Sequence, residues 1–316
     1  RALIEALRDA PFTGPRGPIG WSRPAFDLDA LDEDAAAALL DRDRPDVVVH
    51  AAAWTDVDGC ARDPDLALRR NGTATTALAS ACAARDVELA IISTNEVFDG
   101  TRVDGLGYRP DDEPAPANPY GVAKLAAEQG AAAAYRDGGR RGLAIVRTSW
   151  LFGTGAPDFP RKIVAAARAA RDAGEPLRVV ADEWGSPTYT ADLAEAIVAL
   201  IGADGLVGGP GTIAVHHLVN AGVASRAGWA REVLRLASVD AEVVDVPAST
   251  WQRASSPPRW GVLEPTPLPS GEPMPSWQDA LARYAPTMRG PPPRTGHDRT
   301  GPHPDQRRVA GRETIG

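Results

Sequence analysis

Short, almost wholly apolar segments alternate with longer segments of helical character through the first half of this 316-residue chain. Residues 46–53 contain three consecutive valines, residues 88–94 read Glu-Leu-Ala-Ile-Ile-Ser-Thr, and residues 143–147 read Leu-Ala-Ile-Val-Arg. Continuous apolar runs of this length are typical of strands buried on both faces of a parallel sheet. The alternation therefore predicts βαβ units and an α/β fold with a doubly wound parallel sheet. Further elements are expected between and before these strands, namely helices at 1–9, 29–41 and 65–85 and a short strand and turn at 18–24.

The second half of the chain is less regular, which predicts a smaller second lobe. Residues 247–275 are rich in proline and are expected to be mostly irregular. We expect one domain over residues 1–150, to which 190–220 returns, and a lobe over 151–287. Residues 288–316 include three consecutive prolines and show no periodicity, so they are expected to form a disordered tail. The other elements expected in this half are a strand at 177–180 and helices at 159–173, 190–201, 229–236 and 277–284.

Composition and charge exclude several classes of function. The chain has 34 basic and 42 acidic residues, and its net charge of −8 argues against a nucleic acid or an anionic membrane as the main partner. No apolar run approaches the roughly 20 residues that span a bilayer, and no signal peptide is visible. Cys60 and Cys82 are the two cysteines, and no cysteine or histidine cluster indicates a metal site. These features predict a cytoplasmic protein that binds no metal.

A tyrosine and a lysine lie four residues apart in the stretch 118–124, where Tyr120 follows Pro119 and Lys124 enters a helix-like run. Residues i and i+4 share one face of a helix, so the phenol and the ammonium are expected side by side. A nearby cation favours phenolate and lowers the phenol pKa from about 10. Such a phenol can pass a proton to or from a substrate oxygen near neutral pH. The alternative is a surface Tyr and Lys on an ordinary helix.

Ser93 and Thr94 lie at the carboxyl end of the predicted strand at 88–94. Open α/β sheets bind their ligands at this edge. A hydroxyl there could hold a substrate carbonyl oxygen, while Tyr120 donates the proton and Lys124 lowers the phenol pKa and holds a cofactor ribose. The order of strand, Ser-Thr, loop, Tyr-x-x-x-Lys helix and strand therefore predicts one catalytic set.

Several further segments occur in a fixed order around this set. They include His-Ala-Ala-Ala-Trp-Thr-Asp-Val-Asp at 50–58, Ser-Thr-Asn-Glu-Val-Phe-Asp-Gly at 93–100 and Arg-Thr-Ser-Trp-Leu-Phe-Gly at 147–153. Shorter matches lie at 71–73, 116–121, 185–190, 192–194 and 277–281. With these motifs the chain resembles the extended short-chain dehydrogenase/reductase superfamily and, within it, the dTDP-4-dehydrorhamnose reductase family. The resemblance covers most of residues 1–285.

The resemblance implies a Rossmann-like fold and an NAD(P)H-dependent oxidoreductase that acts on a CH–OH group. The expected reaction is the NADPH-dependent reduction of the C4 keto group of a nucleotide-linked 4-dehydro-6-deoxy sugar, as in deoxysugar biosynthesis. Residues 1–150 would bind the cofactor, and most of 151–287 would bind the substrate. Thr94, Tyr120 and Lys124 would be the catalytic residues. A monomer or a homodimer is expected.

The resemblance also implies binding residues along the chain. Ser22 and Arg23 suit a cofactor 2′-phosphate because no acidic residue ends the preceding predicted strand, so NADPH is favoured and NADH stays open. The alternative is a surface arginine. Trp150 would stack on the sugar, whose C–H face is apolar. The other residues expected at the cofactor are Asp27, Leu28, Ala51, Ala52, Ala53, Thr55, Ser93, Tyr120 and Lys124. The other residues expected at the substrate are Val57, Thr94, Asn95, Glu96 and Arg259.

Three departures from the family pattern matter. Asn95 and Glu96 stand where the family has Asp and Tyr, which could change substrate preference or mark a subgroup with unaltered chemistry. Residues 257–263 resemble the family's substrate loop only loosely, and Arg259 there could meet the pyrophosphate. The family's first strand and Gly-rich turn are not in this sequence, so we expect a fragment or a misassigned start that folds poorly and binds a dinucleotide weakly.

Two other functions stay open. One is an epimerase or dehydratase of the same superfamily; a dehydratase needs an Asp-Glu acid/base pair beside the Thr, and Asn95 with Glu96 supplies half of it. The other is a non-catalytic NADP-binding regulatory subunit. The intact Thr94, Tyr120 and Lys124 argue against such a subunit, while the absent Gly-rich turn argues for it. Net consumption of NADPH would indicate the reductase.

Overall fold

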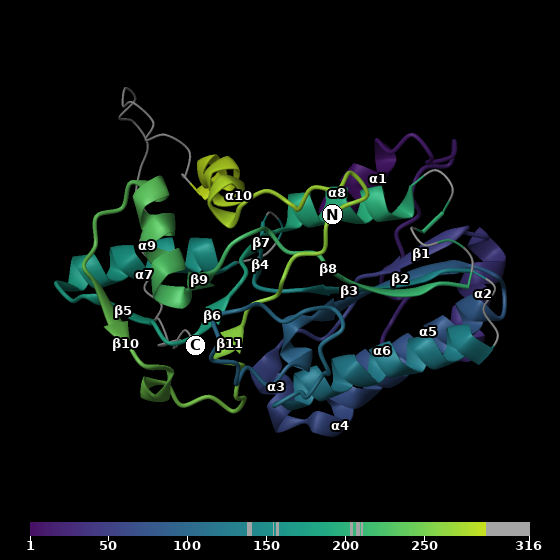
Figure 1. Cartoon of the computed structure of the whole chain (residues 1–316), viewed down its shortest axis with the longest axis horizontal. Coiled ribbons are helices and arrows are strands. Elements are labelled where there is room, and N and C mark those ends of the chain that lie inside the picture. The colour runs from purple at the N-terminus through teal and green to yellow at the C-terminus, as the bar shows by residue number, and fades with distance from the viewer. Residues whose placement is uncertain are drawn as a thin grey trace, which may run out of the picture.

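A four-stranded parallel sheet forms the centre of the larger lobe (Figure 1). The computed structural model describes residues 1–288, apart from 138–140, 154, 156–157, 203–204, 207–208 and 210. The strand order is β1-β2-β3-β8, and each neighbouring pair is parallel. The predicted α/β class with a parallel sheet is confirmed. The strands are β1 (Val47–His50), β2 (Glu88–Thr94), β3 (Leu143–Thr148) and β8 (Ile213–His217).

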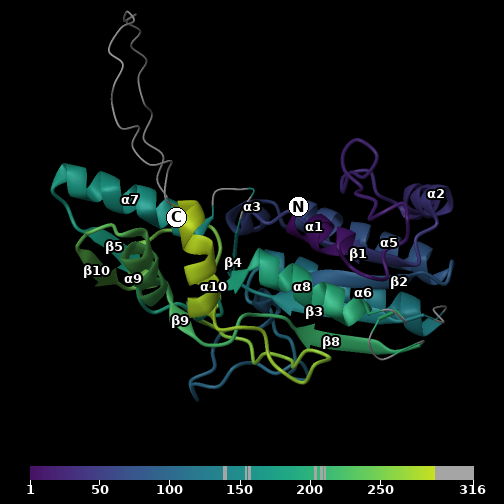
Figure 2. The same cartoon turned by 90° about the horizontal axis from the view of Figure 1, so that it is seen from above.

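Helices cover both faces of this sheet (Figures 1 and 2). Leu89 and Ile91 of β2 belong to the core on one face, and Ala90 belongs to the core on the other, as the alternation of side chains along a strand requires. Fully burying a Leu or Ile side chain contributes about 1.5–3 kcal/mol. One face is covered by α2 (Glu33–Asp43), α5 (Ala74–Ala83) and α6 (Pro119–Asp137), and the other by α1 (Ala2–Arg8) and α8 (Thr190–Ile201).

A second lobe lies beside the carboxyl ends of the sheet strands (Figure 2). Its core gathers around the buried rings of Phe152, Trp229 and Tyr284. The side chain of Asp158 caps the first long helix by accepting from Arg161 N at 3.0 Å. The lobe contains α7 (Phe159–Ala173), β5 (Leu177–Val180), α9 (Arg226–Ala237), β10 (Val243–Val246) and α10 (Trp277–Tyr284).

Very short strands and turns join the two lobes. Parallel pairs connect β4 with β7 and β6 with β11, and β9 lies antiparallel to β6. These strands are β4 (Leu151–Phe152), β6 (Trp184–Gly185), β7 (Thr188–Tyr189), β9 (Ala224–Ser225) and β11 (Trp260–Gly261). The remaining helical elements are α3 (Val57–Arg62), α4 (Pro64–Ala67), the π-helical turn η1 (Leu68–Thr73), and the 3₁₀ turns η2 (Asn95–Val97), η3 (Ala248–Thr250) and η4 (Ala285–Met288).

Several expected elements differ from the structure. Residues 18–24 form no strand, because a turn occupies part of this segment and no ladder partner reaches it. The helix expected from 29 begins at Glu33, since the Asp32 carboxylate caps it by accepting from Ala35 N at 2.8 Å. The strands β8 and β10 were not expected, because the residues around them show no clear strand pattern of apolar side chains.

Two further expectations concern the tail and a membrane. The predicted disordered tail at 288–316 lies outside the described residues except for Met288, which is buried in η4. Within the described part of the chain, no helix has both the length and the apolar character required to cross a bilayer.

Candidate functional site

Thr94 and Tyr120 meet at the carboxyl end of β2. Thr94 ends the strand, and Tyr120 is the second residue of α6; both are buried. The Thr94 hydroxyl is close enough to the Tyr120 phenol to act on its pKa. The Asn118 side chain caps α6 by accepting from Gly121 N at 2.9 Å. A Cβ atom at position 121 would collide with the Glu96 carbonyl oxygen, so glycine allows the start of α6 to lie against η2.

Lys124 lies one helical turn after Tyr120 and is 3% exposed. Its ammonium donates to the Ile92 carbonyl oxygen at 2.6 Å. Burial lowers the pKa of Lys124 to about 8, and the Glu128 carboxylate acts against this shift. The ammonium is thus fixed to the backbone of β2, close to the end of the sheet.

The pKa of the Tyr120 phenol is raised, in contrast to the expected lowering. Burial is the main cause, and the nearby Glu96 and Cys60 add to it, while the Thr94 hydroxyl acts in the opposite direction. Lys124 does not lower this pKa because its ammonium is directed to the strand carbonyl. The phenol therefore keeps its proton at neutral pH.

Ser93 lies beside Thr94 but has a structural partner. Its hydroxyl donates to Glu128 Oε1 at 2.5 Å, and Glu128 also accepts from Arg147 at 2.7 Å. All three side chains are almost completely buried. The predicted contact of Ser93 with a cofactor would have to involve its backbone or a rearrangement of this network.

The segment after β1 places three alanines at the same edge of the sheet. Ala51 and Ala52 are exposed, and Ala53 is half-buried. Asn71 fixes the next residue, since its side chain accepts from Trp54 N at 2.7 Å and donates to Trp54 O at 2.9 Å. Asn71 belongs to the π-helical turn η1, a feature that often occurs at functional sites.

A cavity of about 590 Å³ runs along the edge of β1 that faces away from β2. It is lined by Ala51, Ala52, residues 12–21 and α1. Its volume is within the range of about 300–1,000 Å³ found for small-molecule sites. The small alanine side chains leave the backbone accessible at this edge; a cofactor contact of Ala51, Ala52 and Ala53 stays a prediction. Thr94, Tyr120 and Lys124 are not among its lining residues.

The four residues predicted to contact the adenosine end lie in the turn that precedes α2. Ser22 and Arg23 are exposed, and the 71%-exposed Arg23 side chain pairs with Asp27 at 3.5 Å. Leu28 packs against the main core. Thr55, which was also predicted at the cofactor, is exposed. Val57, which was predicted at the substrate, is the first residue of α3.

Trp150 lies on the opposite side of the site, between the two lobes. The guanidinium of Arg226 lies 3.6 Å from the centroid of its ring, and Trp229 stacks nearly parallel at 5.7 Å. A sugar can therefore stack on Trp150 only where Arg226 leaves the ring free. Sequence reasoning missed Arg226, because nothing in its local spacing marks it as a site residue.

Four charged side chains gather next to Trp150, and we call them the charged array: Glu96, Glu183, Arg226 and Arg253. Glu183 pairs with Arg253 at 3.1 Å and with Arg226 at 3.5 Å. Burial raises the pKa of Glu96, and Arg226 and Arg253 partly offset this shift. Burial lowers the pKa of Arg226 to about 10. The array therefore holds two cations and two carboxyl groups in a largely enclosed space.

Two predicted substrate residues have other roles in the structure. Asn95 is buried and donates to the Gly261 carbonyl oxygen at 3.2 Å, which ties η2 to β11. The Arg259 side chain is 70% exposed and pairs with Asp182 at 3.7 Å. Arg253, from the same proline-rich segment, lies in the charged array instead. A pyrophosphate contact of Arg259 stays a prediction, and Arg253 is the more enclosed guanidinium.

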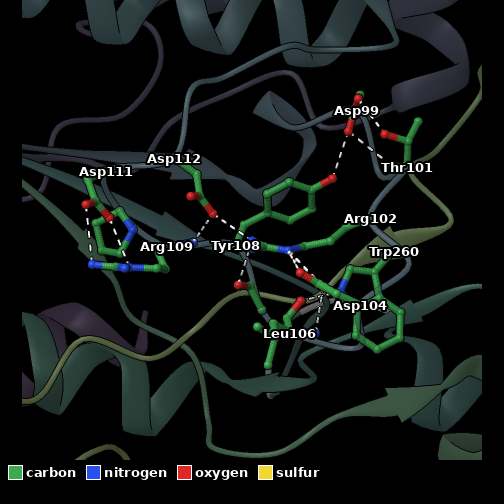
Figure 3. Close-up of polar contacts among 12 residues, drawn as sticks. Asp99, Thr101, Arg102, Asp104, Leu106, Tyr108, Arg109, Asp111, Asp112 and Trp260 are labelled. Atoms are coloured by element: carbon green, nitrogen blue, oxygen red, sulfur yellow. Dashed lines mark hydrogen bonds and ion pairs between the residues drawn. The ribbon is translucent and has the colours of Figure 1, made fainter.

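The loop after η2 fastens this proline-rich segment in place (Figure 3). The Tyr108 hydroxyl donates to Asp99 at 2.7 Å, and Arg102 pairs with Asp112 at 2.8 Å. Trp260 Nε1 donates to the Leu106 carbonyl oxygen at 2.7 Å. The first two bonds order the loop itself, and the third joins it to β11, where backbone bonds from Trp260 N to Gly100 O at 3.1 Å and from Tyr108 N to Val262 O at 2.8 Å add to it. Within the described residues, no group of three or more His, Cys, Asp or Glu side chains could hold a metal ion.

Comparison with known proteins assigns the chain to a family. A family model described as the RmlD substrate binding domain matches residues 13–289. The chain belongs to the RmlD substrate-binding domain family. A dTDP-4-dehydrorhamnose reductase from Streptomyces griseus is 36% identical over 295 residues, which is 92% of each chain. A protein of the same name from Mycobacterium tuberculosis is 38% identical over 266 residues, which is 80% of each chain.

Solved structures of this family have the same fold. The crystal structure of dTDP-4-dehydrorhamnose reductase from Bacillus anthracis in complex with NADP superimposes with a TM-score of 0.76 and 28% identity. The match covers 89% of this chain and 94% of that one. The RmlD-type fold is Rossmann-like, in agreement with the doubly wound sheet expected from the sequence.

Proposed function

We propose that this chain is an NADPH-dependent oxidoreductase that reduces the C4 keto group of a nucleotide-linked 4-dehydro-6-deoxy sugar. The observation that carries the proposal is the placement of Thr94 at the carboxyl end of β2 and of Tyr120 at the start of α6, where Thr94 acts on the phenol and Lys124 follows one turn further. The similarity to proteins named dTDP-4-dehydrorhamnose reductase supports both the reaction and the class of substrate.

Tyr120 acts as the general acid in this proposal. Thr94 holds the C4 carbonyl oxygen, and the Tyr120 phenol donates its proton to that oxygen when C4 accepts a hydride, so that C=O becomes CH–OH. The bound reduced nicotinamide supplies the hydride. The raised pKa of Tyr120 keeps the donor protonated before the reaction. General acid catalysis of this kind contributes about 10²–10⁴-fold.

The phenolate left on Tyr120 needs stabilisation by neighbouring groups. The Thr94 hydroxyl, which acts to lower the phenol pKa, stabilises the phenolate. The residues that would hold the cofactor are Ala51, Ala52 and Ala53 at the sheet edge, Thr55 after them, and Lys124 at the ribose. Ser22 and Arg23 are accessible to a 2′-phosphate.

An NADPH-oxidation assay with dTDP-4-dehydro-6-deoxy sugars tests the proposal. We expect substrate-dependent loss of absorbance at the NADPH band and a product with a C4 hydroxyl. Conversion of the sugar without net consumption of NADPH would indicate an epimerase or a dehydratase. Binding of NADPH without turnover of any sugar would indicate a regulatory subunit.

Location and oligomeric state belong to the same proposal. We expect a cytoplasmic enzyme that is a monomer or a homodimer. Fractionation of cells that express the protein tests the first statement, and light scattering after size-exclusion chromatography tests the second.

A further inference from the structure

We infer that Glu96 is a specificity-determining residue that accepts a hydrogen bond from the sugar hydroxyl next to the carbonyl being reduced. The inference rests on the proposed reduction at C4. It assigns to this chain a preference for keto sugars that carry a C3 hydroxyl over analogues that lack it.

The backbone places Glu96 next to the reacting atoms. Glu96 follows Thr94 by two residues, and its N–H donates to Thr94 Oγ1 at 3.2 Å. Its carbonyl oxygen lies against Gly121, the residue after Tyr120. The Glu96 carboxyl also acts electrostatically on the Tyr120 phenol. A sugar whose C4 oxygen lies between Thr94 and Tyr120 therefore has its neighbouring substituents within reach of this carboxyl.

One oxygen of the carboxyl is held and the other is available. Oε2 accepts from Asn118 Nδ2 at 2.6 Å. Among the described residues, none is hydrogen-bonded to Oε1, and this oxygen is not one of the buried polar atoms without a partner, so it is accessible to solvent. The Asn118 side chain also caps α6, so it cannot turn away without loss of the helix cap. Asn118 thus orients the carboxyl and leaves one acceptor for a ligand.

The two arginines of the charged array are paired with another carboxylate. Arg253 and Arg226 both pair with Glu183, and Arg226 is stacked on Trp150. Their side chains are only 21% and 25% exposed. They offset the charge of Glu96 from a distance, which makes an acceptor tolerable in this enclosed place.

Chemistry decides which sugar substituent meets Glu96. In a 4-dehydro-6-deoxy sugar the carbonyl carbon has the C3 hydroxyl on one side and C5, which carries the methyl group, on the other. A carboxyl packed against the methyl would lose its water without gaining a partner, which is costly. The C3 hydroxyl can donate to Oε1. The carboxyl therefore faces the C3 side of the ring.

The test compares Glu96→Ala with the unaltered enzyme on a dTDP-4-dehydro-6-deoxy sugar and on its 3-deoxy analogue. We expect the unaltered enzyme to favour the 3-hydroxy substrate by about 10- to 100-fold in kcat/KM, the range for one hydrogen bond to a charged group. Glu96→Ala should lose this factor on the 3-hydroxy substrate, mainly through KM, whereas any effect of the lost carboxyl on Tyr120 should change kcat for both substrates alike. The preference should then fall to near one.

Glu96→Gln provides the second variant, because it keeps the volume of the side chain. Its one carbonyl oxygen accepts from Asn118 Nδ2, so an NH2 donor stands where Oε1 accepted. We expect it to fold even if Glu96→Ala does not, and to show a smaller preference than the unaltered enzyme, because a neutral hydrogen bond replaces one to a charged group. An unchanged preference in Glu96→Ala, or an equal fall on both substrates, would overturn the inference and leave the reductase proposal intact. Absence of NADPH oxidation by the unaltered enzyme with both sugars would overturn both.

Discussion

The two sides of the site hold their polar groups in different ways. On the side formed by the sheet edge, Lys124 is bonded to a strand carbonyl and Thr94 acts on the neighbouring Tyr120 phenol. On the opposite side, the charged array pairs side chains with one another, such as Glu183 with Arg226 and Arg253. The first arrangement fixes a proton donor by joining the end of β2 to the start of α6. The second depends on segments that are distant in sequence and meet only after folding.

This contrast separates catalysis from recognition. The sheet edge is set by hydrogen bonds within β2 and α6, so changes there should alter the rate of the reaction. The charged array is set by contacts between the lobes, so changes there should alter which substrate is accepted. The following experiments test whether catalysis and substrate recognition are divided in this way, and they are given in order of decreasing expected effect.

Removal of the phenol hydroxyl should have the largest effect. Tyr120→Phe should lower kcat by about 10²–10⁴-fold, because the general acid is lost. Binding of NADPH, measured by fluorescence titration, should change little. Tyr135→Phe is the matched control, since Tyr135 is buried in α6 and its hydroxyl bonds only the Val87 carbonyl oxygen away from the site. Near-normal turnover by Tyr120→Phe would contradict the assignment.

Breaking the buried ion pair behind the sheet edge should destabilise the fold. Arg147→Met leaves the Glu128 carboxylate buried without its cation, and we expect a loss of about 3–5 kcal/mol in the free energy of unfolding. Urea denaturation measures this loss. Arg231→Met is the control, because its pair with Asp245 is about half-exposed and contributes about 0–1 kcal/mol. Equal stabilities of the two variants would show that the buried pair is not a support of the site.

A pH dependence of stability should arise from the sheet side. Burial lowers the pKa of His50 to about 3, and the charge of Lys124 adds to this. The unfolded chain, with an ordinary pKa near 6.5, binds more protons than the folded protein between these values. The stability is therefore full above pH 6.5 and falls towards pH 3 by up to about 1.4 kcal/mol per pH unit.

His50→Gln checks this dependence, since the amide can still bond the Thr75 hydroxyl. Urea denaturation between pH 4 and 7 should give a smaller slope for the variant. Part of the slope should remain, because burial also lowers the pKa of His217, to about 4. An unchanged slope would exclude His50 as a source.

The smallest effect is expected at the cofactor phosphate. Arg23→Ala should raise KM for NADPH by about 10-fold or less and leave KM for NADH unchanged, because an exposed guanidinium contributes modestly to phosphate binding. Steady-state kinetics with both cofactors measure the difference. Arg136→Ala, an exposed arginine near the far end of α6, is the control. A parallel change for both cofactors would remove Arg23 from the 2′-phosphate site.

The sequence predicted the sheet side well and the charged array poorly. Continuous apolar runs identify β2 and β3, and the spacing of Tyr120 and Lys124 identifies one helical face. Arg226 and Arg253 have no such local signal, because their meeting with Glu183 depends on how the second lobe folds. The predicted lowering of the Tyr120 pKa was wrong in direction for a related reason. The four-residue spacing predicts that Lys124 lies near the phenol, but it does not predict that the phenol is buried, and burial is the main cause of the raised pKa.

The close contact at Gly121 involves only the main chain of residue 96. An exchange of the side chain at 96 therefore leaves the placement of Tyr120 undisturbed, whereas any side chain at 121 would push α6 away from η2. For protein engineering, position 96 is therefore the one to vary when substrate preference is to be changed, whereas position 121 has to remain glycine.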